Sequence, residues 1–85
     1  MNTYFIEFLN INGVETSIKY SNTTRKYYVS TQAEVKEGGL LKSIANHEDT
    51  IEKAIESFNK DIQNKIVVIN AYGENRKELS IPIFE

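Results

Sequence analysis

The run EDTIEKAIESFNKDIQ, residues 48–63, constrains the fold more than any other part of this 85-residue chain. Its apolar residues recur three or four positions apart, so on a helix of 3.6 residues per turn they stack into one stripe. These residues are Ile51, Ala54, Ile55, Phe58 and Ile62. A helix with a single apolar stripe can cover one face of a sheet, so we expect strands to supply the rest of the core.

The ends and the outer side of this helix are marked as well. Asp49 stands at the expected N-cap with Glu52 three residues later, which matches a capping box with Asp in place of Ser or Thr. Glu48 adds negative charge beside the positive end of the helix dipole. Glu56 and Lys60 are four residues apart, in the order that stabilises a helix. The sequence therefore predicts an amphipathic helix with a charged outer side.

The first segment, TYFIEFLNINGVETSIKY, predicts a β-hairpin whose turn is Asn12-Gly13. This pair readily supplies the two positive φ angles of a type I′ turn. With that turn, Ile11 pairs with Val14 and Phe5 pairs with Tyr20. Because side chains alternate along a strand, one face would hold Phe5, Leu9, Ile11, Val14, Ile18 and Tyr20, with Glu7 as a misfit, and the other would hold Tyr4, Ile6 and Phe8 opposite Glu15, Ser17 and Lys19. The first strand is thus apolar on both faces.

The middle of the chain predicts one more strand, followed by a segment whose secondary structure the sequence leaves open. Residues 26–35, KYYVSTQAEV, alternate strictly between apolar and polar, as a half-buried strand does. Gly38 and Gly39 break this strand, because they can take backbone angles that other residues avoid. In residues 40–46, LLKSIAN, the apolar positions fit helical spacing, whereas Leu40, Lys42 and Ile44 suit a short strand. Helix, strand and loop stay open for this segment, and we favour a strand or an irregular segment.

The end of the chain predicts two strands. The run KIVVINAY, residues 65–72, is continuously apolar, as in a strand buried on both faces. The run LSIPIF, residues 79–84, contains Pro82, which has no amide hydrogen and so favours an edge strand. We therefore expect one α+β domain over residues 1–85, with a mainly antiparallel sheet of about five strands and one amphipathic helix packed on one face, in the order β-β-β-α-β-β.

Composition and motifs argue against catalysis. The chain has no Cys, which removes thiolate metal sites and cysteine nucleophiles, and its only imidazole is His47. It contains no P-loop, dinucleotide-binding glycine motif or nucleophile-elbow motif. We expect a non-enzyme without catalytic, metal or cofactor residues. The N-terminal residues lack a basic region and a cleavage site, and no apolar run approaches the roughly 18 residues of a membrane span, so we expect a cytoplasmic protein that does not enter membranes.

Two sets of residues are candidates for binding a protein partner. The acidic set could imitate the phosphates of a nucleic acid towards a basic groove, and consists of Glu48, Asp49, Glu52, Glu56 and Asp61. The apolar set, Tyr4, Ile6 and Phe8, lies on the sheet face that one helix cannot cover. Monomers rarely expose large apolar patches without using them, so this set predicts a homodimer or a partner. Alternatively, residues 38–45 fold back and cover that face.

A weaker candidate is a nucleic-acid surface. Cations and an aromatic ring alternate in the way that single-strand-binding surfaces do, and the set consists of Arg25, Lys26, Tyr28, Arg76 and Lys77. The net charge of −2 argues against nucleic acid as the main partner, because phosphate binders usually carry a basic excess on one face.

Two resemblances to known families point to function. The strand YYVS and the helix opening DTIEKAIESF resemble HicB-family antitoxins, in which a strand pair leads into a helix of similar pattern. The short, Cys-free composition rich in Asn, Ile, Lys and Tyr is similar to that of the phage-encoded inhibitors called anti-CRISPR proteins. We therefore expect a non-enzymatic protein-binding module, such as a phage or mobile-element inhibitor that occludes a host nuclease. The alternatives are a HicB-like antitoxin and a small nucleic-acid-binding domain.

Overall fold

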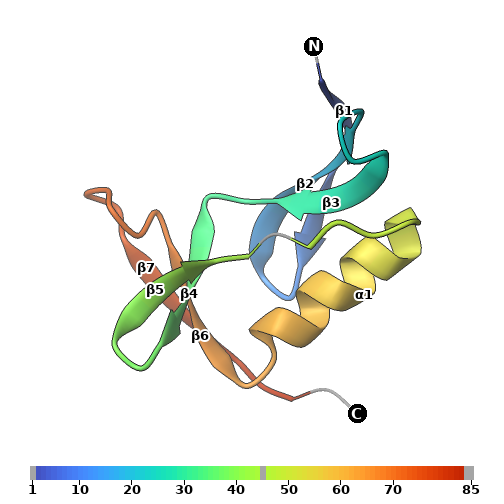
Figure 1. Cartoon of the computed structure of the whole chain (residues 1–85). Coiled ribbons are helices and arrows are strands. Elements are labelled where there is room, and N and C mark those ends of the chain that lie inside the picture. The colour runs from blue at the N-terminus through green and yellow to red at the C-terminus, as the bar shows by residue number, and fades with distance from the viewer. Residues whose placement is uncertain (1, 45, 84–85) are drawn as a thin grey trace.

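The computed structural model describes residues 2–44 and 46–83, which form seven strands and one helix (Figure 1). In chain order these elements are β1 (Thr3–Ile11), β2 (Val14–Ser21), β3 (Lys26–Ser30), β4 (Ala33–Glu37), β5 (Leu40–Ser43), α1 (Ile51–Ile62), β6 (Lys65–Ile69) and β7 (Lys77–Ile81). The protein is mostly antiparallel sheet with a single helix among its described elements, which confirms the expected mixed class.

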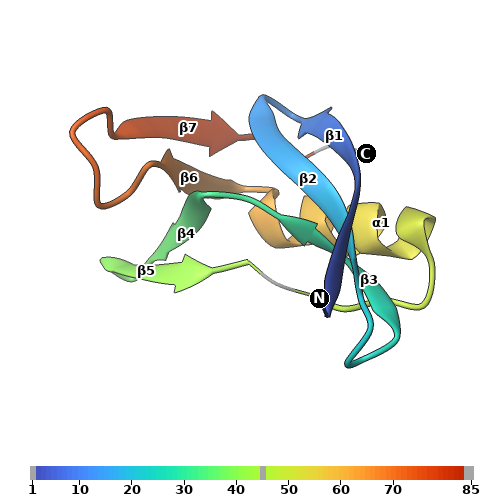
Figure 2. The ribbon, with the colours of Figure 1, turned by 90° about the horizontal axis from the view of Figure 1, so that it is seen from above.

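The strands form two sheets, whereas we expected one sheet of about five strands. Sheet A has the order β1-β2-β3, and sheet B has the order β5-β4-β6-β7. Figure 2 shows the strands of sheet B to one side of those of sheet A, with α1 behind β2 and β3. Every observed strand pair is antiparallel, as expected.

The division into two sheets takes place inside the run that we expected to be one strand, residues 26–35. The strand is interrupted at Thr31 and Gln32, where the chain leaves sheet A and enters sheet B. The Thr31 hydroxyl donates to the backbone oxygen of Glu15 at 2.9 Å and accepts from the backbone N–H of Ala33 at 3.3 Å. The apolar alternation continues through this crossing, so the pattern alone gives no sign of it.

The turns at Asn12-Gly13 and Gly38-Gly39 behave as expected. Asn12 and Gly13 have φ angles of 53° and 92°, as a type I′ turn requires, and Ile11 pairs with Val14. Gly38 and Gly39 also have positive φ, and they join β4 to β5. Within residues 40–46, whose structure the sequence leaves open, Leu40–Ser43 is a strand that pairs with β4. This strand does not fold over sheet A. Ala45 lies outside the described residues.

A β-bulge in β1 corrects the expected faces of the first strand. The register shifts between Phe5 and Glu7, so that Phe5 lies opposite Lys19, and Tyr4 rather than Phe5 lies opposite Tyr20. One extra residue in a strand moves every side chain beyond it to the other face. The predicted pairing of Phe5 with Tyr20 is therefore wrong, although the pairs from Glu7 to the turn keep the faces that the sequence predicts.

The helix closes the core against both sheets. Its N-cap is Thr50, whose hydroxyl accepts from the backbone N–H of Lys53 at 3.1 Å, so the expected cap at Asp49 is wrong by one residue. Ala54, Phe58 and Ile62 are buried, as the stripe predicts. They pack with apolar residues of both sheets, among them Ile11, Val14, Ile18, Val29, Ala33, Val35, Val67 and Ile81.

The last two strands largely follow the sequence. Val67 and Val68 point to opposite faces of sheet B and both are fully buried, as expected for a strand covered on both sides. Strand β7 lies at the edge of its sheet, as Pro82 predicts, but it spans Lys77–Ile81, so Pro82 and Ile83 of the expected strand lie outside it. Phe84, at the end of the expected strand, lies outside the described residues.

Candidate functional site

The outer face of sheet A, on the side away from the core, carries exposed aromatic rings. The bulge places Phe5 on this face beside Phe8, and their ring centroids lie 4.7 Å apart. Phe5 is 53% exposed and Phe8 is 78% exposed. Of the predicted apolar set, Tyr4 and Ile6 are exposed as well, but Tyr4 pairs with Tyr20 on the opposite face, and Ile6 lies within the bulge. The bulge therefore replaces Tyr4 with Phe5 as the neighbour of Phe8.

A row of side chains crosses the outer face from β1 to the segment before α1. Phe5 lies opposite Lys19 on β2, and Lys19 lies opposite Tyr28 on β3. The rings of Tyr28 and His47 have centroids 4.7 Å apart. We name the surface formed by Phe5, Phe8, Lys19, Tyr28 and His47 the aromatic face.

The backbone holds His47 at the end of this row. Tyr27 and Glu48 each donate a backbone N–H to the other's backbone oxygen, both at 2.8 Å. This isolated bridge lays residues 46–49 along the edge of β3, as a short addition to sheet A. Because α1 begins just after the bridge, the same contact fixes the start of the helix against the sheet. His47 therefore takes its place through pairing with a strand about twenty residues earlier in the chain.

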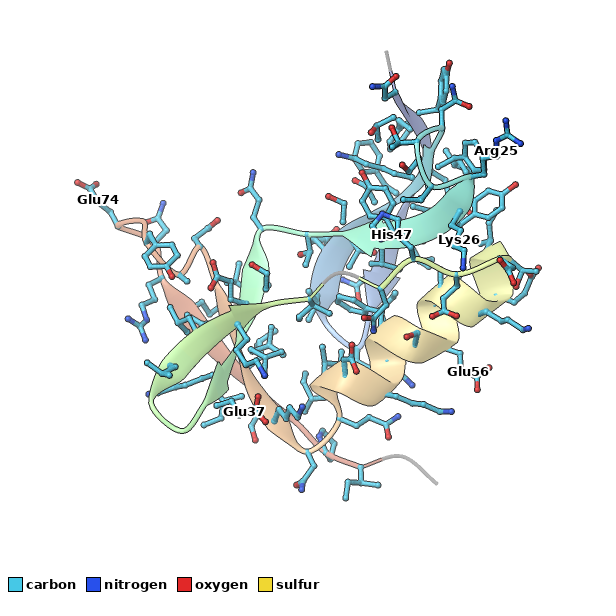
Figure 3. All side chains as sticks on the ribbon, in the orientation of Figure 1. Arg25, Lys26, Glu37, His47, Glu56 and Glu74 are labelled. Atoms are coloured by element: carbon cyan, nitrogen blue, oxygen red, sulfur yellow. The ribbon has the colours of Figure 1, made fainter. Side chains whose placement is uncertain are left out.

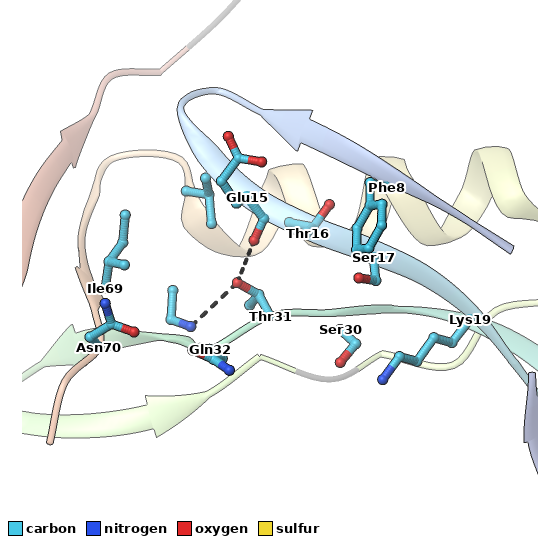
Figure 4. Close-up of a pocket in the computed structure, with 12 residues that line it drawn as sticks. Phe8, Glu15, Thr16, Ser17, Lys19, Ser30, Thr31, Gln32, Ile69 and Asn70 are labelled. Carbon is cyan, nitrogen blue, oxygen red and sulfur yellow. Dashed lines mark hydrogen bonds between the residues drawn. The ribbon is translucent and has the colours of Figure 1, made fainter. Parts of the chain in front are cut away.

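A groove of about 540 Å³ adjoins the aromatic face where the chain crosses between the sheets (Figure 4). Its walls combine hydroxyl and amide side chains with apolar ones and with the charged Glu15, and Phe8 and Lys19 are shared with the aromatic face; the hydroxyl and amide side chains include Ser17, Ser30, Thr31, Gln32 and Asn70. In Figure 4 the Phe8 ring lies over Ser17, and the Lys19 side chain reaches towards Ser30. The groove thus offers hydrogen-bonding groups next to exposed rings.

The predicted acidic set lies along α1 and just before it, mixed with cations. Asp49 pairs with Lys26 at 3.7 Å, and Glu56 pairs with Lys60 at 3.2 Å. Asp61 accepts a hydrogen bond from the side-chain amide of Asn46. Glu48 and Glu56 line a shallow pocket together with Lys53 and Lys60. The surface carries both signs of charge, and its imitation of phosphate stays a prediction.

The predicted nucleic-acid set does not form one patch. Arg25 and Lys26 lie at the start of β3, whereas Arg76 and Lys77 lie at the start of β7, and Figures 1 and 2 place these two strands at opposite ends of the molecule. Figure 3 shows Arg25 and Lys26 far from Glu74, in the turn that precedes Arg76. Arg76 contacts Glu78 at 3.5 Å. Only Tyr28 of this set belongs to the aromatic face.

Three members of the aromatic face are absent from the sites that the sequence predicts. The sequence pattern predicts Phe5 on the inner face, and it marks neither Lys19 nor the single imidazole, His47, as a site residue. The signal that could have indicated Lys19 was its expected place on the outer face of the hairpin. The positions of Phe5 and His47 depend on a bulge and on a distant backbone pairing, for which the sequence has no local mark.

Among the described residues, no group of three or more His, Asp or Glu side chains is placed to hold a metal ion. The one helix in residues 2–44 and 46–83 is too short to cross a membrane. Comparison of the chain with models of protein families, with curated proteins and with solved structures finds no match. The resemblances to HicB antitoxins and to anti-CRISPR proteins therefore stay predictions.

Proposed function

We propose that this chain is a non-enzymatic protein-binding module that occupies a partner's surface through its aromatic face. The observation that supports this most is the exposure of Phe8, which is 78% open to solvent although it lies on a sheet face beside a second exposed ring. Leaving such rings in water forgoes the free energy of burying them, about 1.5–3 kcal/mol for a Phe side chain. A partner surface would recover that free energy.

The composition of the aromatic face suits a protein interface. Aromatic residues are enriched at the centres of interfaces, where a few anchors carry most of the binding free energy. Phe5 and Phe8 supply apolar anchors, and Tyr28 adds a ring with a polar end. Lys19 lies between Phe5 and Tyr28 and would orient an acidic group of the partner. The neighbouring groove adds hydrogen-bonding side chains at the rim.

Such a module would act as an inhibitor carried by a phage or a mobile element, which blocks a host protein such as a nuclease by steric occlusion. It needs no catalytic group. Binding energy concentrated in a few rings is sufficient, because the inhibitor has only to exclude the natural ligand of its partner.

Affinity capture from a host lysate tests the proposal, with mass spectrometry of the proteins retained. The test variant is Phe5→Ala with Phe8→Ala. The control variant is Leu40→Ala with Tyr72→Ala, which removes two side chains outside the aromatic face that are 72% and 82% exposed. We expect a partner that wild type and control retain and the test variant loses, with equal melting temperatures. Equal retention by all three proteins would contradict the proposal.

The acidic set is tested separately. Reversing Glu52 and Glu56 to Lys changes exposed positions of α1 and should leave the fold intact. If the helix imitates phosphate, this variant no longer retains the partner, whereas binding through the aromatic face alone leaves capture unchanged. The comparison of the two double variants therefore assigns the contact to the helix, to sheet A or to both.

A second candidate function is the binding of single-stranded nucleic acid. It is favoured by the row Phe5, Lys19, Tyr28 and His47, which alternates rings with a cation in the way that stacking platforms do. Fluorescence anisotropy with a labelled single-stranded oligonucleotide at low salt tests it. Affinity that falls steeply as salt rises, and that falls further in Lys19→Ala, would support this function. Absence of binding at low salt would remove it.

A further inference from the structure

Strand β1 is an open edge of sheet A, and beyond its bulge residues 7–11 run along that edge in regular register. The other edges of the two sheets are short, charged or covered: β5 has four residues, β7 carries Lys77 and Glu78, and β3 is partly covered by the bridge to Glu48. Strand β1 has nine residues, of which only Glu7 is charged. Exposed edges present unpaired backbone groups and are usually blocked by charge, proline, short length or a bulge. On β1 the bulge and the inward-facing Glu7 lie in the first part of the strand, so residues 8–11 have none of these protections. The edge of β1 is therefore the one best suited to accept another strand.

Next to this edge, apolar side chains on the inner face are only partly covered. Leu9 is half-buried against the core, and so is Ile55 of α1. Between them lies a groove of about 570 Å³ that follows β1 and the helix, with Ile11 and Asn59 in its walls. A strand added beside β1 would direct alternate side chains into this groove. The incomplete burial of Leu9 is what such a strand would correct.

A second copy of the chain fits this edge by symmetry. Beyond the bulge, Glu7 to Ile11 pair with β2 in regular register. An antiparallel pair of two such segments about a two-fold axis at Leu9 places Leu9 of one copy opposite Leu9 of the other. The same pairing sets Glu7 opposite Ile11 and Phe8 opposite Asn10. The only charge of the strand therefore meets an apolar residue and not its own copy, which avoids like-charge repulsion.

We infer that two copies of this chain associate through β1, antiparallel about Leu9, to form one continuous six-stranded sheet from two copies of sheet A. In this dimer the two Phe8 side chains lie on the same outer face at diagonal positions, about 7–8 Å apart between their backbones, within reach of aromatic rings. The two aromatic faces become one surface to which each copy contributes Phe5 and Phe8.

Charge exchange at residue 8 tests the dimer by sedimentation equilibrium. We expect wild type to dimerise at micromolar concentration. Phe8→Lys and Phe8→Glu should each raise the dissociation constant about tenfold or more, because like charges meet and ring burial is lost. An equimolar mixture of the two should restore association as a heterodimer. Leu40→Lys, which adds the same charge at a 72% exposed position on β5, should dimerise like wild type.

The possible results are distinct. A wild type that stays monomeric at its highest soluble concentration overturns the inference, as does a mixture of the two charge variants that associates no better than either alone. Unchanged association of Phe8→Lys would move the interface away from β1. The inference stands apart from the proposed function: a monomer can still lose its partner when Phe5 and Phe8 are replaced, and a dimer can exist whose partner ignores those rings.

Discussion

The outer faces of the two sheets are built from similar strands but differ in how far their apolar side chains are exposed to solvent. On sheet B, Val68 points away from the main core and is nevertheless 0% exposed. On sheet A, Phe8 occupies the corresponding outer side and is 78% exposed. The difference shows that a chain of this size is able to bury a side chain on an outer sheet face with its own residues, as it does at Val68, although Ile66 on the same face is 40% exposed.

Long polar side chains cover Val68 on sheet B. Val68 lies between Glu34 and Glu78 on the neighbouring strands. Glu34 accepts a hydrogen bond from the Tyr72 hydroxyl at 3.4 Å, and Glu78 pairs with Lys36 and with Arg76, both at 3.5 Å. The carbon chains of such residues cover apolar surface while their charges stay in water.

Sheet A has no comparable cover over its rings. The residues opposite Phe8 and next to it across the sheet are Ser17 and Ser30, whose side chains are too short to reach over a ring. Lys19 lies beside Phe5 but extends towards Ser30 along the groove (Figure 4). Since ordinary residues bury Val68 on the outer face of sheet B, the open rings of sheet A do not follow from small size alone, and this supports their use as a contact surface.

The largest expected effect concerns the element that both sheets share. Phe58→Ala removes the ring that α1 buries against them and should cost about 3–5 kcal/mol of unfolding free energy. That is a large part of the stability of a small domain. Thermal unfolding followed by circular dichroism measures it. Cooperative melting within a few degrees of wild type would show that the sheets do not depend on the helix.

Val68→Ala tests whether the outer face of sheet B is truly packed. Because Val68 is fully buried, the variant should lose about 1–3 kcal/mol, the range for removing most of a buried Val side chain. The midpoint of urea unfolding measures the loss, with Ser80→Ala on exposed β7 as the control. A midpoint equal to that of the control would mean that the polar cover leaves Val68 accessible to water, and the contrast between the sheets would disappear.

Phe8→Ala should leave stability almost unchanged, within about 0.5 kcal/mol, because the ring is mostly in solvent and contributes little to the core. The same urea experiment measures it, at protein concentrations low enough to keep the chain monomeric. A loss near that of Phe58→Ala would indicate that the ring is packed in solution. The aromatic face would then be part of the core and not a contact surface.

A small effect is also expected for the charges that cover Val68. Glu78→Gln removes two partly exposed ion pairs, with Lys36 and Arg76, each worth about 0.2–1 kcal/mol before screening by salt. The carbon chain remains, so Val68 should stay covered. Unfolding in low and high salt separates the contributions, since only the charge effect should disappear in high salt. A larger loss of unfolding free energy that persists in high salt would show that the cover over Val68 depends on the specific contacts of Glu78 and not on its charge alone.

Local signals in the sequence account for the parts of the fold that were predicted correctly. The stripe of α1 follows from 3.6-residue spacing, and its members Ala54, Phe58 and Ile62 are buried. The turn at Asn12-Gly13 follows from the need for two positive φ angles, and it sets the register up to Glu7. Pro82 marks an edge because it lacks an amide hydrogen. Each of these features depends on residues that are adjacent in the chain or only a few positions apart.

The rest depended on contacts between distant segments. The bulge that turns Phe5 outward arises where β1 meets β2, and the crossing at Thr31 is fixed by a hydrogen bond to Glu15, sixteen residues earlier. Neither the bulge nor the crossing changes the apolar alternation of the sequence. Alternation indicates which side of a strand is buried, but not which strand lies beside it. The sequence by itself determined the helix, the turns at Asn12-Gly13 and Gly38-Gly39 and most of the buried positions, because these depend on local spacing. The tertiary structure alone decided that there are two sheets and that Phe5, Lys19 and His47 meet on one face, because these depend on which strands lie side by side.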